Sequence, residues 1–289
     1  MSRPAWLCCV VALTLVPGVG RAAVLFNEIL INPWGSDDTR EFVELISTTG
    51  ADSLTNVWLL EIETDDATLR GRVDMARDLS AAAFGTNGLL LIGHNYGTVN
   101  DYGVTNPPTG LFSLSRPGVS TIENDVHLLL ATDFTGAVGT DYDADNDGVL
   151  DSTPWSALLD SVVLASSDLP EYVPGTRVLI ADGLGTVDAV VRFPGTFTAN
   201  SASAWFGGDM VLDVGPNLFD AGNVTANFPV GAELTPGLPN FTPVPEPAGL
   251  ALLSLASVAG AFLRWLRGRR WALESRLQPV RGFAPTRTG

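Results

Sequence analysis

The 289-residue chain contains no lysine, two histidines and two cysteines, and each shortage excludes a class of chemistry. Without lysine there is no Schiff-base nucleophile and no serine–lysine pair. Both cysteines, Cys8 and Cys9, lie in an N-terminal apolar stretch that we expect to be removed, so the mature chain holds no disulfide and no thiolate. His94 and His127 fall in or beside expected strands, where a single histidine is more often packed than ligating. Since no Gly-x-Ser-x-Gly, His-Glu-x-x-His or P-loop pattern occurs either, we predict that the protein is not an enzyme.

The few cations are unevenly distributed along the chain. Residues 24–242 contain 30 acidic residues and 7 arginines, a net charge of −23, whereas residues 264–289 contain 7 arginines and one glutamate. A surface of charge −23 argues against nucleic acid as a partner, because phosphate backbones would be repelled. It is typical of a solvated extracellular domain that binds cations.

The N-terminus has the three parts of a Sec signal peptide. Arg3 supplies a positive charge, residues 5–16 form an apolar run of 12, and Pro17 to Gly20 break it. Gly20 and Ala22 place small residues at the −3 and −1 positions of a cut between Ala22 and Ala23. We predict that residues 1–22 direct the chain to the Sec machinery and are cleaved.

A second targeting signal lies near the C-terminus. The motif Val244-Pro245-Glu246-Pro247 precedes 16 uncharged residues, 248–263, and an arginine cluster follows. As a helix the uncharged run spans about 24 Å, and residues 264–266 extend it toward the roughly 30 Å of a bilayer core. We predict a transmembrane helix over 248–266 and a basic tail over 267–289, cytoplasmic by the positive-inside rule. The cluster consists of Arg264, Arg267, Arg269 and Arg270.

This order of parts resembles the PEP-CTERM sorting signal of bacterial surface proteins. The resemblance covers Val244 to Arg270 and implies processing by an exosortase near the Pro-Glu-Pro motif, then delivery to the cell surface or extracellular matrix. Residues 242–247 would serve as a proline-rich spacer. One departure is that 19 further residues, 271–289, follow the basic cluster, whereas tails of this kind usually end soon after it.

Between the two targeting signals, short apolar segments alternate with turn residues. Many are rich in β-branched and aromatic residues, and Asn87-Gly88 and Asp182-Gly183 are hairpin-type pairs. Only residues 74–83 have helical spacing, through Met75, Leu79 and Ala83. The pattern predicts an all-β sandwich with at most one short helix. Expected strands are 24–30, 41–47, 57–63, 88–93, 126–131, 161–165, 176–181, 189–193 and 210–214.

The two ends of this region resemble the lamin-tail domain. Asn27-Glu28-Ile29, Glu41-Phe42-Val43-Glu44-Leu45 and Val57-Trp58-Leu59-Leu60 carry the match at the start, and Thr235-Pro236-Gly237-Leu238-Pro239-Asn240 carries it at the end. The resemblance implies an immunoglobulin-like β-sandwich over residues 23–241 in which these residues build the fold and catalyse nothing. The middle is longer than a minimal family domain, so we expect a loop-rich insertion around 95–175.

The sharpest chemical pattern is Asp141-Tyr-Asp-Ala-Asp-Asn-Asp-Gly-Val-Leu-Asp151. Alternate carboxylates followed by a glycine turn can surround one hard cation, and Ca²⁺ takes six to eight oxygen ligands. The spacing resembles extracellular calcium loops of the thrombospondin type 3 kind and lacks the position-12 glutamate of an EF-hand. The alternative is a solvated acidic turn. The expected ligands are Asp143, Asp145, Asp147, the carbonyl of Val149, and Asp151.

Two further functional hypotheses remain open. Glu41 and Glu44 could suggest a glycosidase pair, but residues three apart on a strand point to opposite faces, so framework hydrogen bonding and a solvated face are favoured. A secreted hydrolase of polysaccharide or phosphoester would bring Glu28, Glu44, Asp160 or His127 into one pocket with the acidic loop. A third hypothesis is a binding module for extracellular polysaccharide or protein. We favour the exported, calcium-stabilised structural or binding module.

Overall fold

The computed structural model describes residues 24–33, 40–50, 52–93, 102–106, 108–114, 122, 125–164, 169–179, 186–211 and 217–240. The chain divides into two units, Met1–Phe241 and Thr242–Gly289, and all described residues belong to the first. The predicted signal peptide, spacer, transmembrane helix and basic tail lie outside the described residues. Within the described ranges, no helix has the length and apolar character that a membrane crossing needs.

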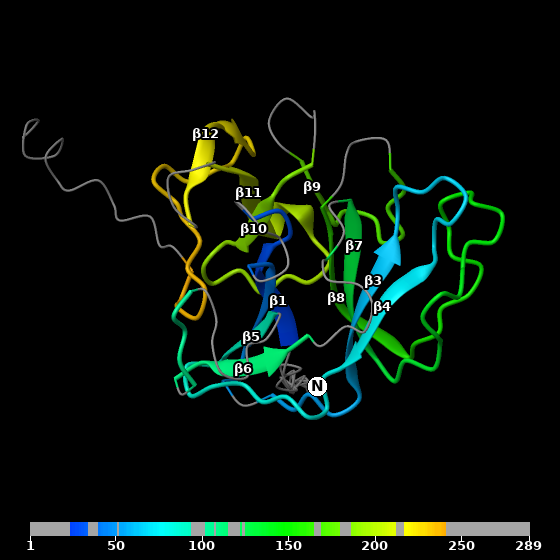
Figure 1. Ribbon diagram of the computed structural model, residues 1–289, viewed down its shortest axis with the longest axis horizontal. Helices are drawn as coiled ribbons and strands as arrows, with labels where there is room; N and C mark the ends of the chain where they lie inside the picture. Colours follow the sequence, from blue (N-terminus) through cyan, green and yellow to red (C-terminus); the bar gives the residue numbers. More distant parts are fainter. Residues whose placement is uncertain are drawn as a thin grey trace, which may run out of the picture. The chain divides into compact units, whose positions relative to one another are not determined.

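The described chain forms two β-sheets, and one short 3-10 helix, η2 (Ala202–Ala204), is its helical element (Figure 1). The first sheet has the order β12-β11-β10-β1-β2-β5-β6, and the second has the order β4-β3-β7-β8-β9. Neighbouring strands are antiparallel except for the pairs β5–β6 and β8–β9, which are parallel. The all-β, two-sheet prediction is therefore confirmed. The first sheet comprises β1 Val24–Leu30, β2 Phe42–Ser47, β5 Leu89–Gly93, β6 Gly110–Ser113, β10 Ala189–Arg192, β11 Trp205–Met210 and β12 Phe219–Val224. The second comprises β3 Val57–Glu63, β4 Val73–Asp78, β7 Val126–Thr132, β8 Ala157–Leu164 and β9 Arg177–Val178.

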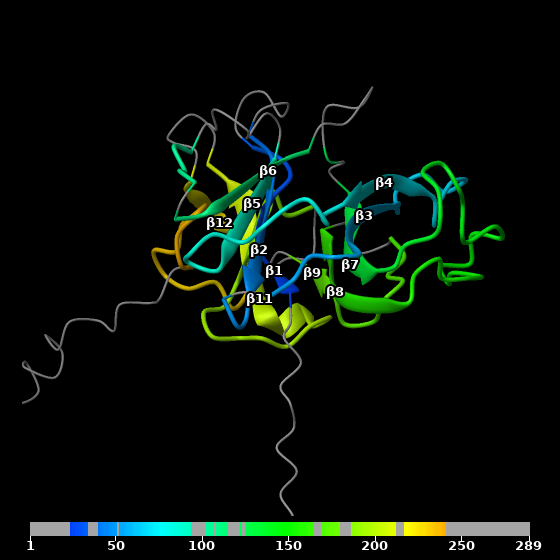
Figure 2. The same cartoon turned by 90° about the horizontal axis from the view of Figure 1, so that it is seen from below.

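The main hydrophobic core lies between the two sheets, which face each other in Figures 1 and 2. Because side chains alternate along a strand, alternate residues of the central strands enter this layer, and the bulge of β1 between Phe26 and Glu28 shifts the alternation there. Val43 and Leu45 of β2 enter it from the first sheet, and Leu128 and Leu130 of β7 enter it from the second; all four are at most 1 % exposed. Burial of these aliphatic side chains is the main stabilising contribution, at about 25 cal/mol per Å².

Each sheet also has a covered outer face. The first sheet packs its outer residues, such as Phe42 and Phe206, against the chain that follows β12, up to Leu234. The second packs Leu60 and Leu129 beneath the long connection between β7 and β8, drawn in green in Figures 1 and 2, and beneath Tyr172. The C-terminal end of the domain and the acidic loop therefore cover opposite outer faces of the sandwich.

Several boundaries differ from the sequence predictions. The helical spacing over 74–83, for which at most one short helix was predicted, gives no helix: Val73–Asp78 is strand β4, in which Val73 and Met75 are buried at the strand period of two. Of the strand expected at 210–214, Met210 is the last residue of β11 (Trp205–Met210), and 212–214 lie outside the described residues. Strands β6 and β12 were not expected. The segment 95–175, expected as a loop-rich insertion, contributes β6, β7 and β8, and β7 is the middle strand of the second sheet.

Candidate functional site: an acidic loop and two buried carboxylate networks

The acidic loop brings three of its predicted ligands together. One carboxylate oxygen each of Asp143, Asp145 and Asp147 lie within 4.8 Å of one another. Two oxygens bound to one Ca²⁺ at about 2.4 Å can be separated by at most about 4.8 Å, so this spacing fits a shared cation. Asp143 is fully buried, whereas Asp145 and Asp147 are exposed, which leaves the cluster open to solvent on one side.

Local backbone chemistry folds the loop around these carboxylates. The carboxylate of Asp143 accepts hydrogen bonds from the backbone N–H groups of Asp147 (3.1 Å) and Gly148 (2.9 Å). Asn146 and Gly148 adopt φ of 56° and 88°, the left-handed region that Asn and Gly tolerate best. The chain therefore turns sharply enough for alternate aspartates to face inward.

The other two predicted ligands lie at the loop's end. The carboxylate of Asp151 accepts a hydrogen bond from Ala144 N–H (3.0 Å) and is not part of the three-carboxylate cluster. The N–H of Val149 donates to Asp147 (2.9 Å), and its side chain is exposed. Their roles as ligands stay predictions. Asn146 Oδ1, which the sequence pattern did not single out as a ligand, is buried without a donor among the described residues.

The loop is fixed to the edge of the second sheet. Tyr142 N–H donates to the carbonyl of Gly71 (3.1 Å), and Val73 N–H donates to the carbonyl of Thr140 (3.0 Å). A Cβ at residue 71 would stand 2.5 Å from Asp143 Cβ, and Gly71 has φ of 85°. Glycine is therefore required here both for close approach and for backbone conformation.

Tyr172 joins the loop to the face of the second sheet. Its hydroxyl donates to Asp143 Oδ2 (3.1 Å), and burial together with the charge of Asp143 raises the pKa of Tyr172. Its ring stacks on His127 of β7 at a centroid distance of 6.0 Å. Burial and the neighbouring Arg177 lower the pKa of His127 to about 3, so its imidazole is neutral at physiological pH. Neither contact could be read from the sequence, because Tyr172 and His127 lie far from the loop in the chain.

A second network binds residues 235–240, here called the closing segment, to β1 and β2. Glu28 is fully buried, and its carboxylate accepts hydrogen bonds from Thr235 N–H (2.9 Å) and the Thr235 hydroxyl (3.1 Å). Glu44 accepts hydrogen bonds from Gly237 N–H (2.5 Å) and from the side chain of Asn27 (2.6 Å). The framework hydrogen bonding expected of Glu28 and Glu44 is present and holds the two ends of the domain together, but both residues are buried and not on a solvated face.

Asn240 completes this network. Its amide group donates to the carbonyls of Asn27 (3.0 Å) and Arg192 (2.7 Å), and its Oδ1 accepts from the Asn27 side chain (2.7 Å). Asn27 and Asn240 are both less than a tenth exposed. The two sequence motifs that suggested a lamin-tail domain are therefore in direct contact.

The two carboxyl groups of this network are protonated more readily than usual. Burial raises the pKa of Glu44 to about 8 and, together with the charge of Glu44, raises that of Glu28 well above its ordinary value. The hydrogen bonds from Thr235, Gly237 and Asn27 oppose these shifts. Near neutral pH the pair therefore holds protons that the unfolded chain would release.

The domain is expected to become less stable as pH rises from about 5 to 8. Both groups bind protons more tightly when folded, so in this window the folded state holds more protons and the free energy of unfolding falls with pH. Glu28→Gln should flatten this slope and raise stability at pH 8 by on the order of 1–2 kcal/mol. The glutamine can still accept a hydrogen bond from Thr235 N–H and donate one to the Thr235 hydroxyl.

Urea unfolding at pH 5.5, 7 and 8 measures how the free energy of unfolding changes with pH. The neighbouring exposed Glu233→Gln is the matched control, and equal slopes for the two variants would contradict the assignment.

A third network lies inside the sandwich. Asp160 of β8 and Arg192 of β10 are at most 1 % exposed and form an ion pair that links the two sheets. Asp160 also accepts from the N–H groups of Phe26 (3.0 Å) and Asn200 (2.9 Å). Arg192 donates to the carbonyl of Phe26 (2.5 Å) and lies 4.4 Å from the ring centroid of Trp205. Both charges are thus fully paired, as buried ions must be.

The residues that a hydrolase would gather are dispersed among these networks. Glu28 and Glu44 lie on the outer face of the first sheet, Asp160 lies between the sheets, and His127 lies beneath Tyr172 on the outer face of the second. Glu41 is buried and accepts from Ile122 N–H (2.7 Å). His94, Ala22, Ala23 and the sorting residues from Val244 to Arg270 lie outside the described residues.

Comparison of the chain with protein-family models, curated proteins and solved structures gives no match.

Proposed function

We propose that this protein is an exported, non-enzymatic surface or matrix module whose β-sandwich is stabilised by Ca²⁺. The observation that carries the proposal is the pair of expected targeting signals, residues 1–22 and 244–270, on either side of a domain of net charge −23. We further propose the finer fold, an immunoglobulin-like sandwich of the lamin-tail kind. The contacts of Asn27, Glu28 and Glu44 with the closing segment support it, because they join the motifs at the two ends.

The non-enzymatic role is supported by how the ionisable side chains are used. Glu28 and Glu44 bind the closing segment, and Asp160 pairs with Arg192. Two sheets separate Glu28 and Glu44 from Asp143. General acid–base catalysis needs its groups within hydrogen-bond reach of one substrate. Side chains so arranged stabilise a fold instead.

The sorting route is tested by changing the motif before the apolar run. In a host that carries an exosortase, Pro245, Glu246 and Pro247 are replaced together by alanine. We expect the variant to stay in the inner-membrane fraction, whereas the natural chain reaches the cell surface. Arg276→Ala, a change in the tail beyond the arginine cluster, is the control and should leave delivery unchanged. Equal surface amounts of the motif variant and the natural chain would contradict the exosortase route.

Calcium is expected to raise the melting temperature of the domain. For a Kd of about 10⁻⁴–10⁻³ M, the range of extracellular calcium modules, 5 mM Ca²⁺ stabilises by about 1–2 kcal/mol, or about 2–8 °C. The Asp145→Asn and Asp147→Asn double variant should lose this shift. Each asparagine keeps an Oδ1 that accepts the hydrogen bond now made to the aspartate, so the loop should keep its shape. Differential scanning calorimetry with Ca²⁺, Mg²⁺ and chelator measures the effect. An equal calcium shift in the variant, or none in the natural chain, would contradict the site.

A further inference from the structure

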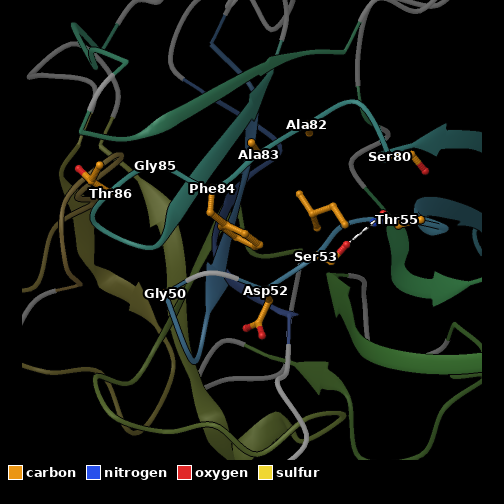
Figure 3. A pocket seen from close by; sticks show the side chains of 11 residues that line it. Gly50, Asp52, Ser53, Thr55, Ser80, Ala82, Ala83, Phe84, Gly85 and Thr86 are labelled. Atoms are coloured by element: carbon orange, nitrogen blue, oxygen red, sulfur yellow. Dashed lines mark hydrogen bonds between the residues drawn. The ribbon is translucent and has the colours of Figure 1, made fainter.

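An open pocket of about 460 Å³ lies at the end of β4 (Figure 3). One wall is the connection after β2, with Asp52, Ser53 and Thr55, and the other is the segment before β5, with Ser80 and Phe84. Its volume is within the roughly 300–1,000 Å³ of small-molecule sites. The acidic loop, in contrast, is fixed near the start of β4, at Gly71 and Val73. The pocket is therefore separate from the proposed calcium site.

Phe84 provides a fixed apolar surface in this pocket. Figure 3 shows its ring between the two walls. The side chain is partly exposed, and its other side packs against the main core. Buried Leu54 and the small residues Ala82, Ala83 and Gly50 also line the pocket. A held aromatic face with open space beside it suits a flat ligand that presents C–H groups.

Asp52 provides an oriented acceptor. Its carboxylate accepts hydrogen bonds from the hydroxyls of Ser47 (2.8 Å) and Thr49 (2.9 Å), which fix its position. A carboxylate has about four lone-pair sites, so Asp52 can accept further hydrogen bonds from a ligand. Ser53, Thr55, Ser80 and Thr86 also line the pocket with hydroxyl groups. The Ser53 hydroxyl donates to Thr55 and the Ser80 hydroxyl accepts from Asn56 N–H, and each hydroxyl oxygen keeps a lone pair that can accept from a ligand.

These groups together select a class of ligand. The lining contains one carboxylate and no arginine, and the domain is strongly acidic, so an anionic ligand would be repelled. A ligand with many hydroxyls and one apolar C–H face satisfies both the hydroxyl-rich walls and the phenyl ring. We propose that this pocket binds a neutral saccharide. The inference rests on the proposed function, an exported surface or matrix module, and names a ligand for that module.

Titration calorimetry of the full chain in detergent tests this site with maltohexaose, cellohexaose and laminarihexaose as probes. At least one should bind with a Kd of about 1 mM or tighter. Phe84→Leu should weaken that binding about fivefold or more, because the apolar bulk stays but the ring face is lost. The control is Phe112→Leu, since Phe112 is also partly buried against the main core but does not line the pocket; its Kd should stay within about twofold of the natural chain's. Ala83→Arg, which fills the pocket from an exposed position, should abolish binding.

The proposal is overturned if none of the three probes binds at 10 mM, or if Phe84→Leu and Phe112→Leu bind alike. Binding should persist in chelator, because the pocket does not involve the acidic loop. Loss of the calcium shift or of tail processing with saccharide binding intact would contradict the proposed function and leave this site standing. Failure of saccharide binding with processing intact would overturn this inference alone.

Discussion

Replacing Asp160 by alanine is expected to destabilise the domain by about 3–5 kcal/mol. The change leaves Arg192 buried between the two sheets without its carboxylate partner, and it removes the acceptor for the N–H groups of Phe26 and Asn200. Removal of one partner from a buried ion pair has costs of this size because the other charge stays desolvated. For a domain with a total stability of about 5–15 kcal/mol, this is a large part of the whole. Chemical unfolding of residues 23–241 measures the loss.

A double variant separates the ion pair from simple loss of packing. If the two charges stabilise each other, Asp160→Ala with Arg192→Ala should be less destabilised than the sum of the single variants. Asp220→Ala, an exchange on the partly exposed strand β12, should change stability by less than about 0.5 kcal/mol. A loss below about 1 kcal/mol for Asp160→Ala would contradict the proposed importance of the pair.

Ending the domain at Leu234 instead of Phe241 is expected to cost roughly 5 kcal/mol. The shorter chain lacks the donors that Thr235, Gly237 and Asn240 provide to β1 and β2. Glu28, Glu44 and Asn27 then lose buried partners, at about 1–3 kcal/mol for each unpaired group. Urea unfolding of the two chains at pH 7 compares them.

Single substitutions show whether the closing segment acts through its polar contacts. Asn240→Ala should cost about 2–4 kcal/mol, because Asn240 makes several buried hydrogen bonds at once. Leu238→Ala, at a position 61 % exposed in the same segment, should be nearly neutral. Equal small effects of the two substitutions would contradict the role assigned to Asn240.

The sequence predicted strands best where most residues of a segment are apolar, as in strands that are buried on both faces of their sheet. Residues 24–30 and 57–63 match β1 and β3 because their many apolar residues leave no other interpretation. Strand β12 was missed because Asp220, Gly222 and Asn223 are polar or lack a side chain, so the segment has no apolar period of two. Residues 205–209 of strand β11 were not predicted because Gly207 and Gly208 look like turn residues. They are there because a Cβ would stand 2.3 Å and 2.4 Å from carbonyl oxygens of the neighbouring strands.

The candidate sites were predictable only where their chemistry is local in sequence. The alternation of Asp143, Asp145 and Asp147 predicted a cluster because the three residues share one loop. The buried networks depend on pairs such as Glu44 with Gly237, which lie 193 positions apart. Spacing rules do not relate such residues, so Glu44 could be assigned to the framework but its partner could not be named.

The termini of the mature protein test the account most directly. Mass spectrometry of protein collected from the surface of producing cells should find an N-terminus at Ala23 and a C-terminus near Pro245–Pro247, with no peptide from residues 248–289. These termini are expected because a targeting signal that is cleaved off lies on each side of the acidic domain. Surface protein that keeps residues 248–289, or protein that keeps residues 1–22 inside the cell, would contradict export and sorting by this route.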